Sequence, residues 1–183
     1  MSTDVLLPLV IFFALGMPIL LLLWRLFVVG GELRRDAQLG RTAVDIARRA
    51  DRSLAELSLL VDDLRRRRAG PEASAASLHA CAEALRRYAV EAEAVDRRGR
   101  YPEGTGLRAE VERAIRAVDL VEHGRVRMLD PHAEGISEGE TEIKRGYLNL
   151  LHTSESIRAR ADEIAAAAKT PTGVDPRWRG PSR

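Results

Sequence analysis

Histidines and carboxylates are the residues of this chain whose types and spacing could support metal binding or acid–base catalysis. Asp119 and His123 are four residues apart, a spacing at which two side chains meet on one face of a helix. A di-iron site in a helical bundle needs an E-x-x-H pair on each of two helices. That pattern is absent, because the residues three positions before the four histidines are Ala76, Leu120, Leu129 and Asn149. We therefore interpret Asp119 and His123 as a local hydrogen bond or ion pair, and we predict no metal site and no cofactor.

The acidic stretch 130–142 holds a second group of potential metal ligands. Its candidate side chains are Asp130, His132, Glu134, Glu138 and Glu140. A calcium-binding loop requires a bidentate acid at its twelfth position, where this chain has Thr141. The pattern favours a solvated turn followed by acids at a helix start. A metal- or small-ligand-binding bundle, or an enzyme, that uses Asp119 and His123 or the 130–142 region remains the alternative.

Motifs for nucleotide binding and nucleophilic catalysis are weak. Residues 104–109 match G-x-G-x-x-A, but the dinucleotide motif needs a preceding strand, and here a helical pattern and an arginine-rich turn precede it. The sequence has no G-x-S-x-G elbow, P-loop or zinc motif. Its one cysteine, Cys81, excludes an intrachain disulfide and fits a helical pattern as a small core residue. We predict that the protein is not an enzyme and has no catalytic or cofactor-binding residues.

Composition favours an all-α fold as the framework for these residues. Hydrophobic residues make up 45% of the 183 residues and aromatic residues only 4%, a balance that suits helices better than a sheet. Charged residues make up 31%, with opposite charges interleaved and a net charge of +2. This charge pattern does not favour nucleic acid as a partner.

Residues 5–29 form an apolar run in which Arg25 is the only charge. An uncharged apolar run of about 18 residues or more is long enough to cross a bilayer as a helix. The flank 1–4 has no Lys or Arg, and no A-x-A cleavage site follows the run, which disfavours a cleaved signal peptide. We predict a single-pass transmembrane helix over 5–29, with the lipid bilayer as a partner.

Arginines after this run predict its orientation. Arg25, Arg34, Arg35 and Arg41 lie on the C-terminal side, whereas the N-terminal flank has no positive residue. The positive-inside rule then places the N-terminus outside the cell membrane and the C-terminal domain in the cytoplasm. The predicted membrane-interface residues are Trp24, Arg25, Arg34 and Arg35.

Four amphipathic segments follow the apolar run. Apolar residues spaced by three and four predict helices over about 32–68, 72–97, 106–129 and 138–168. Their short connections predict an antiparallel four-helix bundle over 43–169 with coiled-coil-like packing. Two helical hairpins that need a second chain are the alternative. Residues 30–42 are expected to form a hinge at Gly30–Gly31 and a juxtamembrane stalk, and the tail 170–183 is predicted to be disordered.

The helix ends carry recognisable signals. Thr105 is expected to cap the third helix, and Ser137 with Glu140 forms an S-x-x-E capping box for the fourth. Arg125 interrupts the apolar stripe of the third helix, so the end of that helix is less well defined.

The fourth segment has the most regular apolar stripe and one irregularity. The stripe is Ile143, Tyr147, Leu150, Ser154, Ile157, Ala161, Ile164 and Ala168. Leu148 projects roughly opposite Leu150, with Leu151 to one side and His152 near Leu148. We interpret Tyr147, Leu148, Leu151 and His152 as a candidate partner surface, with burial inside the molecule as an equal alternative. The resulting hypothesis is a membrane-anchored bundle with a non-catalytic binding, scaffolding or regulatory role, through a protein partner or self-association of helix faces.

Overall fold

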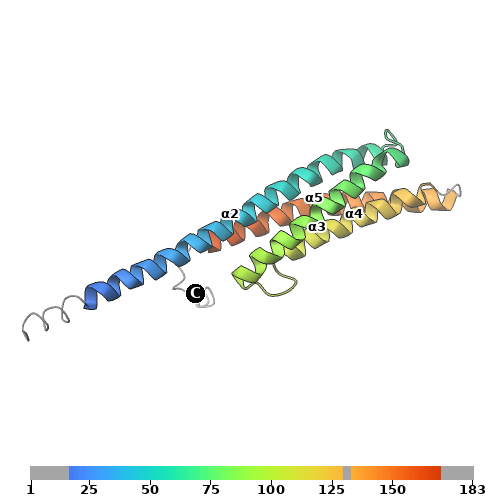
Figure 1. The fold of residues 1–183 in the computed structure, drawn as a ribbon. Helices are drawn as coiled ribbons and strands as arrows, with labels where there is room; N and C mark the ends of the chain where they lie inside the picture. Colours follow the sequence, from blue (N-terminus) through green and yellow to red (C-terminus); the bar gives the residue numbers. More distant parts are fainter. Residues whose placement is uncertain (1–16, 130–132, 170–183) are drawn as a thin grey trace, which may run out of the picture. The chain divides into compact units, whose positions relative to one another are not determined.

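The computed structural model describes residues 17–129 and 133–169, which contain four helices and no strand. The helices are α2 (Met17–Arg65), α3 (Pro71–Gly99), α4 (Leu107–Arg127) and α5 (Ala133–Ala167) (Figure 1). The all-α prediction is confirmed. The chain divides into two compact units, Leu39–Ala167 and Met1–Gln38 with Ala168–Arg183. The predicted flank 1–4 and disordered tail 170–183 lie outside the described residues.

Within Leu39–Ala167 the helices form an antiparallel bundle, which confirms the predicted helical bundle. Ion pairs join each helix to the next around a ring: Arg49–Glu91, Arg108–Glu93, Arg127–Glu138 and Asp51–Arg158. From Arg49 to Ser53 along α2, the partners on α3 run backwards from Glu91 to Cys81. Adjacent helices therefore run in opposite directions.

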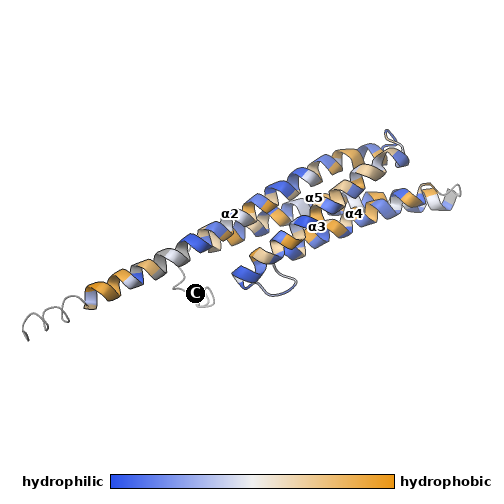
Figure 2. Ribbon diagram, in the orientation of Figure 1, coloured by the Kyte–Doolittle hydropathy of each residue, from blue (hydrophilic) through white to orange (hydrophobic). Residues whose placement is uncertain are grey.

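The core of the bundle comes from residues spaced three and four apart, which lie on one face of each helix. Apolar and polar residues alternate along the helices accordingly (Figure 2). The largest fully buried side chains are Ile46, Leu54, Leu64, Leu78, Leu85, Leu107, Ile143, Leu150, Ile157, Ile164, Val61 and Val111. All four helices contribute to this list, so the core is shared by the whole unit.

The predicted transmembrane helix over 5–29 is contradicted by the structure. No helix within residues 17–129 and 133–169 is both long and apolar enough to cross a membrane. The described part of the run, residues 17–29, forms the start of α2 and contains Arg25. Residues 5–16 of the predicted span lie outside the described residues.

The same finding overturns the predicted localisation. A cell-membrane location, an outside N-terminus and a cytoplasmic C-terminal domain were all deduced from that span. The bilayer as a partner, and the membrane-interface roles of Trp24, Arg25, Arg34 and Arg35, lose their basis with it.

Helix α2 continues without a break through Gly30 and Gly31, where a hinge was expected, and residues 32–42 are helical, as the predicted helix over 32–68 requires. A glycine in a helix interior costs only about 1 kcal/mol relative to alanine. Helix propagation on both sides offsets this cost, because each added residue contributes a hydrogen bond. The bundle unit already begins at Leu39.

Two helix starts differ from their predicted caps. Helix α5 begins at Ala133, so Ser137 and Glu140 lie inside the helix and form no capping box. Thr105 donates its hydroxyl hydrogen bond to the carbonyl of Pro102 at 2.9 Å and leaves the N-terminus of α4 to another residue.

Asp96 of α3 caps the N-terminus of α4. Its two carboxylate oxygens accept the backbone N–H groups of Leu107 and Arg108, each at 2.8 Å. Gly106 is the N-cap residue, and a Cβ there would overlap the Asp96 carboxylate. The carboxylate thus occupies the helix N-terminus at which the G-x-G-x-x-A match would need a phosphate.

Replacing Asp96 with alanine is expected to destabilise the bundle by about 1–2 kcal/mol, because two N–H groups of α4 lose their acceptor. Urea unfolding followed by circular dichroism measures the change. Glu103→Ala, at an exposed position in the turn between α3 and α4, should change the free energy of unfolding by less than about 0.5 kcal/mol. Equal losses for the two variants would contradict the capping role.

Arg125, the interruption in the third stripe, is buried and paired. It is 8% exposed and donates to the Glu122 carboxylate at 2.6 and 2.7 Å and to the carbonyl of Pro71 at 3.1 Å. The hydrogen bond to Glu122 raises the pKa of Arg125, and burial offsets part of this effect. Arg125 therefore extends the contact of α4 with the start of α3.

Helices α4 and α5 approach each other closely at three glycines. A Cβ on Gly124 would lie 2.7 Å from the carbonyl oxygen of Gly139, and a Cβ on Gly139 would lie 2.5 Å from that of Gly124. A Cβ on Gly146 would overlap Cγ2 of Val121. The two backbones are therefore packed at a distance that leaves no room for side chains.

Candidate functional site

The outer side of α5 carries the exposed apolar residues of the predicted partner surface. Leu148 is 56% exposed and Leu151 44% exposed, whereas Leu150 between them is 1% exposed. His152 is also exposed. Within the described residues, this side of α5 is left uncovered and is not buried against another helix.

Tyr147, the fourth residue of the predicted surface, turns towards α2. Its ring is half-buried, and the guanidinium carbon of Arg65 lies 5.2 Å from the ring centroid. A cation over an aromatic face is a favourable contact. Tyr147 therefore links α5 to α2 at the edge of the surface formed by Leu148, Leu151 and His152.

A polar network sets the register of α5 against α2. Ser154 donates to Asp51 at 2.6 Å, and Arg158 donates to the same carboxylate oxygen at 2.7 and 3.0 Å. Residue 51 therefore lies at the same height along the bundle axis as residues 154–158, and residue 65 lies at the same height as, or level with, residue 147. Because the helices are antiparallel, residue 59 lies level with about 148–151.

Leu59 places an exposed apolar side chain of α2 at that level, and it is 72% exposed. Arg48 and Arg52 are exposed on the same helix, and Glu155 and Asp162 are exposed on α5. None of these four charged residues forms an ion pair within residues 17–129 and 133–169. We call the surface formed by Arg48, Arg52 and Leu59 of α2 and Leu148, Leu151, Glu155 and Asp162 of α5 the α2–α5 face.

Sequence reasoning missed the α2 half of this face. Its signal was Leu59, which lies off the stripe Leu54, Leu57 and Val61. That signal becomes interpretable only with the register between α2 and α5, which depends on contacts such as Asp51–Arg158 between residues 107 positions apart.

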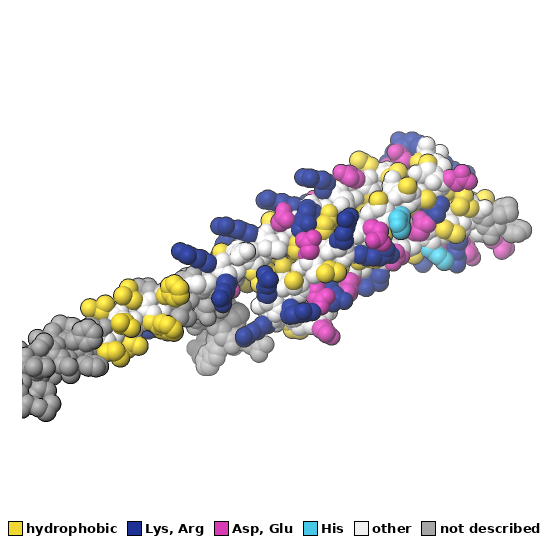
Figure 3. Space-filling model, in the orientation of Figure 1, with side chains coloured by type: hydrophobic (Ala, Val, Ile, Leu, Met, Phe, Trp, Pro, Cys, Tyr) yellow, Lys and Arg dark blue, Asp and Glu magenta, His cyan; other side chains and the backbone are white. Residues whose placement is uncertain are grey.

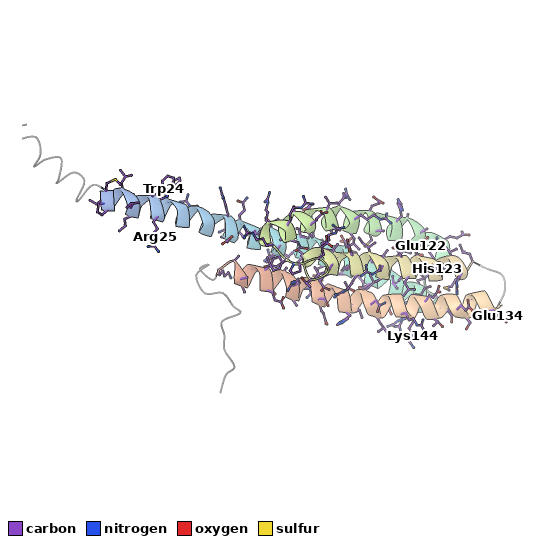
Figure 4. The ribbon with its side chains drawn as sticks, turned by 90° about the horizontal axis from the view of Figure 1, so that it is seen from below. Trp24, Arg25, Glu122, His123, Glu134 and Lys144 are labelled. Atoms are coloured by element: carbon purple, nitrogen blue, oxygen red, sulfur yellow. The ribbon has the colours of Figure 1, made fainter. Side chains whose placement is uncertain are left out.

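Lys144 of α5 points away from α4 (Figure 4).

Asp119 and His123 are exposed on α4 and form neither a hydrogen bond nor an ion pair with each other. Glu122, which lies between them, pairs with Arg125. In the described part of the chain, no three His, Cys, Asp or Glu side chains are grouped so that they could hold a metal ion. The expected local pair is therefore not formed.

The acidic stretch is divided among separate contacts. Asp130 and His132 lie outside the described residues, and Glu134 is exposed in the first turn of α5. Glu138 pairs with Arg127 of α4, and Glu140 pairs with Arg67 after the end of α2. Glu138 and Glu140 therefore join neighbouring segments of the bundle, whereas Glu134 lies at the surface.

A groove of about 520 Å³ lies at the α3–α4 turn. Glu93 pairs with Arg97 and Arg108, and Arg108 also pairs with Glu112. The Asp96 carboxylate accepts a backbone N–H group at the N-terminus of α4. Both arginines of the groove, Arg97 and Arg108, are therefore held in ion pairs within the bundle.

Cys81 lies in a groove of about 300 Å³ between α2 and α3. Its Sγ is 3.7 Å from the carbonyl oxygen of Ser53. Burial, together with the nearby charge of Glu56, raises the pKa of the thiol to about 11. A thiol that stays protonated at neutral pH is a poor nucleophile, which argues against a catalytic role.

Native Cys81 should react with a thiol reagent at pH 8 about 100-fold more slowly than an ordinary cysteine, because the pKa is about 11 in place of 9.0. Absorbance of a chromogenic disulfide reagent measures the rate in buffer and in urea. The rate should rise towards pH 11 in the folded chain. Equal rates in folded and unfolded protein at pH 8 would show that the thiol is not protected.

The start of α2, in the unit that contains Met1–Gln38, is an exposed apolar segment. Trp24 is 68% exposed and Phe27 is 81% exposed, and Ile19 to Leu23 are all at least 59% exposed. Hydrophobic side chains cover the visible surface of this segment (Figure 3). Trp24 and Arg25 project from opposite sides of the helix (Figure 4), and Arg34 and Arg35 are exposed further along it.

Comparison with known proteins finds no matching family model, no similar characterised protein and no similar solved structure.

Proposed function

We propose that this protein is a non-catalytic helical bundle that binds a protein partner through the α2–α5 face, as a scaffold or a regulator. The observation that carries the proposal is the contrast between Leu148 and Leu151, which are half-exposed, and Leu150, which is buried. The outer side of an amphipathic helix in an isolated bundle is polar. Exposed apolar residues grouped on one face are typical of interaction sites.

The side chains that could act in catalysis are occupied by contacts within the bundle, which supports a binding role over catalysis. Glu122 is paired with Arg125, and Glu138 is paired with Arg127. The Cys81 thiol has a raised pKa. These groups contribute to packing and ion pairing within the bundle, whereas Leu148 and Leu151 have no comparable role in it.

The double substitution Leu148→Asp and Leu151→Asp in the full chain is expected to reduce recovery of the bound partner at least about tenfold, because two leucine contacts are lost and two charges must be desolvated. Quantitative co-purification with a tagged chain measures recovery. Val90→Asp is the matched control, since Val90 is 68% exposed on α3, away from the α2–α5 face. Unchanged recovery with the double variant, in a chain with native circular dichroism, would refute the proposal.

A further inference from the structure

We propose that the partner of the α2–α5 face is the same face of a second copy of this chain, with α2 of each copy packed against α5 of the other. This inference rests on the binding role proposed above and specifies its occupant.

The register between α2 and α5 makes the face complementary to itself. Consider a two-fold axis that is parallel to the helices and passes through the contact between the two faces. It places α2 of one copy against α5 of the other. Such an axis keeps every residue at its own level along the bundle. Because α2 and α5 are antiparallel within one copy, they are also antiparallel across the axis.

Apolar side chains meet at the centre of this arrangement. Residue 51 is level with 154–158 and residue 65 with 147. Leu59 of one copy therefore lies level with Leu148 and Leu151 of the other. All three side chains are 44–72% exposed in a single chain, so pairing removes apolar surface from water on both sides of the axis.

Opposite charges meet at one end of the same arrangement. Arg48 and Arg52 lie at the level of residues 155–162, where α5 carries Glu155 and Asp162. All four residues are exposed and form no ion pair within the described parts of a single chain. In the dimer each arginine faces a carboxylate of the other copy, and the two-fold axis forms these pairs twice.

The other end of the face contributes little to the stability of the dimer. Lys144 of α5 comes level with Asp62 of α2, but Asp62 already pairs with Arg65, Arg66 and Arg68. The pairing is therefore held by the leucine centre and by the Arg48–Arg52 end.

The size of the face indicates a weak or transient dimer. From Leu148 to Asp162 along α5 it extends about 21 Å, and two helices make it about 20 Å wide. Two copies then bury on the order of 900 Å² in total, which lies in the range of weak and transient associations.

Cross-linking between two variants of the full chain, each with one added exposed cysteine, tests this geometry. Leu59→Cys and Leu148→Cys chains carrying different tags are mixed and treated with a short bismaleimide, while the buried Cys81 stays unmodified. Mixed dimers should form about tenfold more than with Val90→Cys in place of Leu59→Cys, because Val90 lies on α3 outside the face. Equal yields from the two mixtures would overturn the proposal, since random collisions would then explain both.

Charge reversal provides an independent test in the same assay. Arg48→Glu with Arg52→Glu in the Leu59→Cys chain should lower the mixed-dimer yield about tenfold, because two attractive pairs become repulsive. Glu155→Arg with Asp162→Arg in the Leu148→Cys chain should restore it. A loss that the second pair of substitutions does not restore, in chains with native circular dichroism, would contradict the proposed pairing.

The failure of this inference is distinguishable from failure of the binding role. A photoreactive side chain in place of Leu148 reports on any bound protein. If it cross-links to a different protein but Leu59→Cys and Leu148→Cys chains do not cross-link above the Val90→Cys control, the second-copy inference is wrong and the binding role remains. If position 148 captures no protein at all, both are wrong.

Discussion

Replacing Gly139 with valine is expected to destabilise the bundle by about 3 kcal/mol, or roughly 10 °C in Tm. A Cβ at this position would lie 2.5 Å from the carbonyl oxygen of Gly124 and 2.9 Å from Cγ of Met128. The nearest obstacle is backbone, which cannot rotate away as a long side chain can. Helices α4 and α5 must therefore separate, and the contacts of Gly146 with Val121 are lost with them.

Alanine at the same position separates the steric effect from helix propensity. Glycine to alanine in a helix interior normally stabilises by about 1 kcal/mol. Gly31→Ala should not lower the Tm, because Gly31 precedes the bundle unit that begins at Leu39 and a Cβ there meets nothing within 4 Å. Gly139→Ala should instead lower stability. Differential scanning calorimetry of the three variants measures Tm, and an unchanged Tm for Gly139→Val would show that the helices are not packed this closely.

Leu150→Ala is expected to cost about 3 kcal/mol of unfolding free energy, whereas Leu148→Ala should cost less than about 0.5 kcal/mol. The two leucines are two residues apart on α5, but Leu150 is 1% exposed and Leu148 is 56% exposed. Truncation at 150 leaves a cavity among well-packed neighbours, and truncation at 148 removes a side chain that is largely in water. The pair therefore separates the contribution to folding from the contribution to binding.

Urea unfolding of both variants at one low protein concentration measures this difference without interference from association. Similar losses at the two positions would mean that Leu148 is part of the core, which would remove the main argument for the α2–α5 face. A small loss at 148 together with reduced partner recovery is the outcome that the binding role requires.

Periodicity was sufficient to predict the buried apolar residues of α5. Ile143, Leu150, Ile157, Ala161 and Ile164 follow the alternating four–three spacing and are all buried. This works because a helix that faces a core must repeat its apolar residues with the period of the helix. The same logic assigned an outward direction to Leu148, which is exposed.

Long-range contacts were not predictable in the same way. The cap of α4 comes from Asp96, which precedes Leu107 by 11 residues, and the register of α2 against α5 depends on Asp51 and Arg158. The close approach at Gly124 and Gly139 has no hydropathy signal, because glycine has no side chain to bury. Each of these features depends on tertiary geometry that hydrophobic periodicity does not encode.

The prediction of a transmembrane span failed for a different reason. It depended on the uninterrupted length of the apolar run 5–29. No helix of the described residues is long and apolar enough to cross a membrane. Of that run the structure describes residues 17–29, and α2 continues from them without a break to Arg34 and Arg35.

Site-directed photo-cross-linking of the full chain in its native cells tests the binding role of the α2–α5 face most directly. A photoreactive side chain replaces Leu148, and in a matched chain it replaces Val90, which is 68% exposed on α3. The account predicts a discrete cross-linked product from position 148, either a second copy of the chain or another protein, and none from position 90. Equal products from both positions, or no product from position 148, would contradict it.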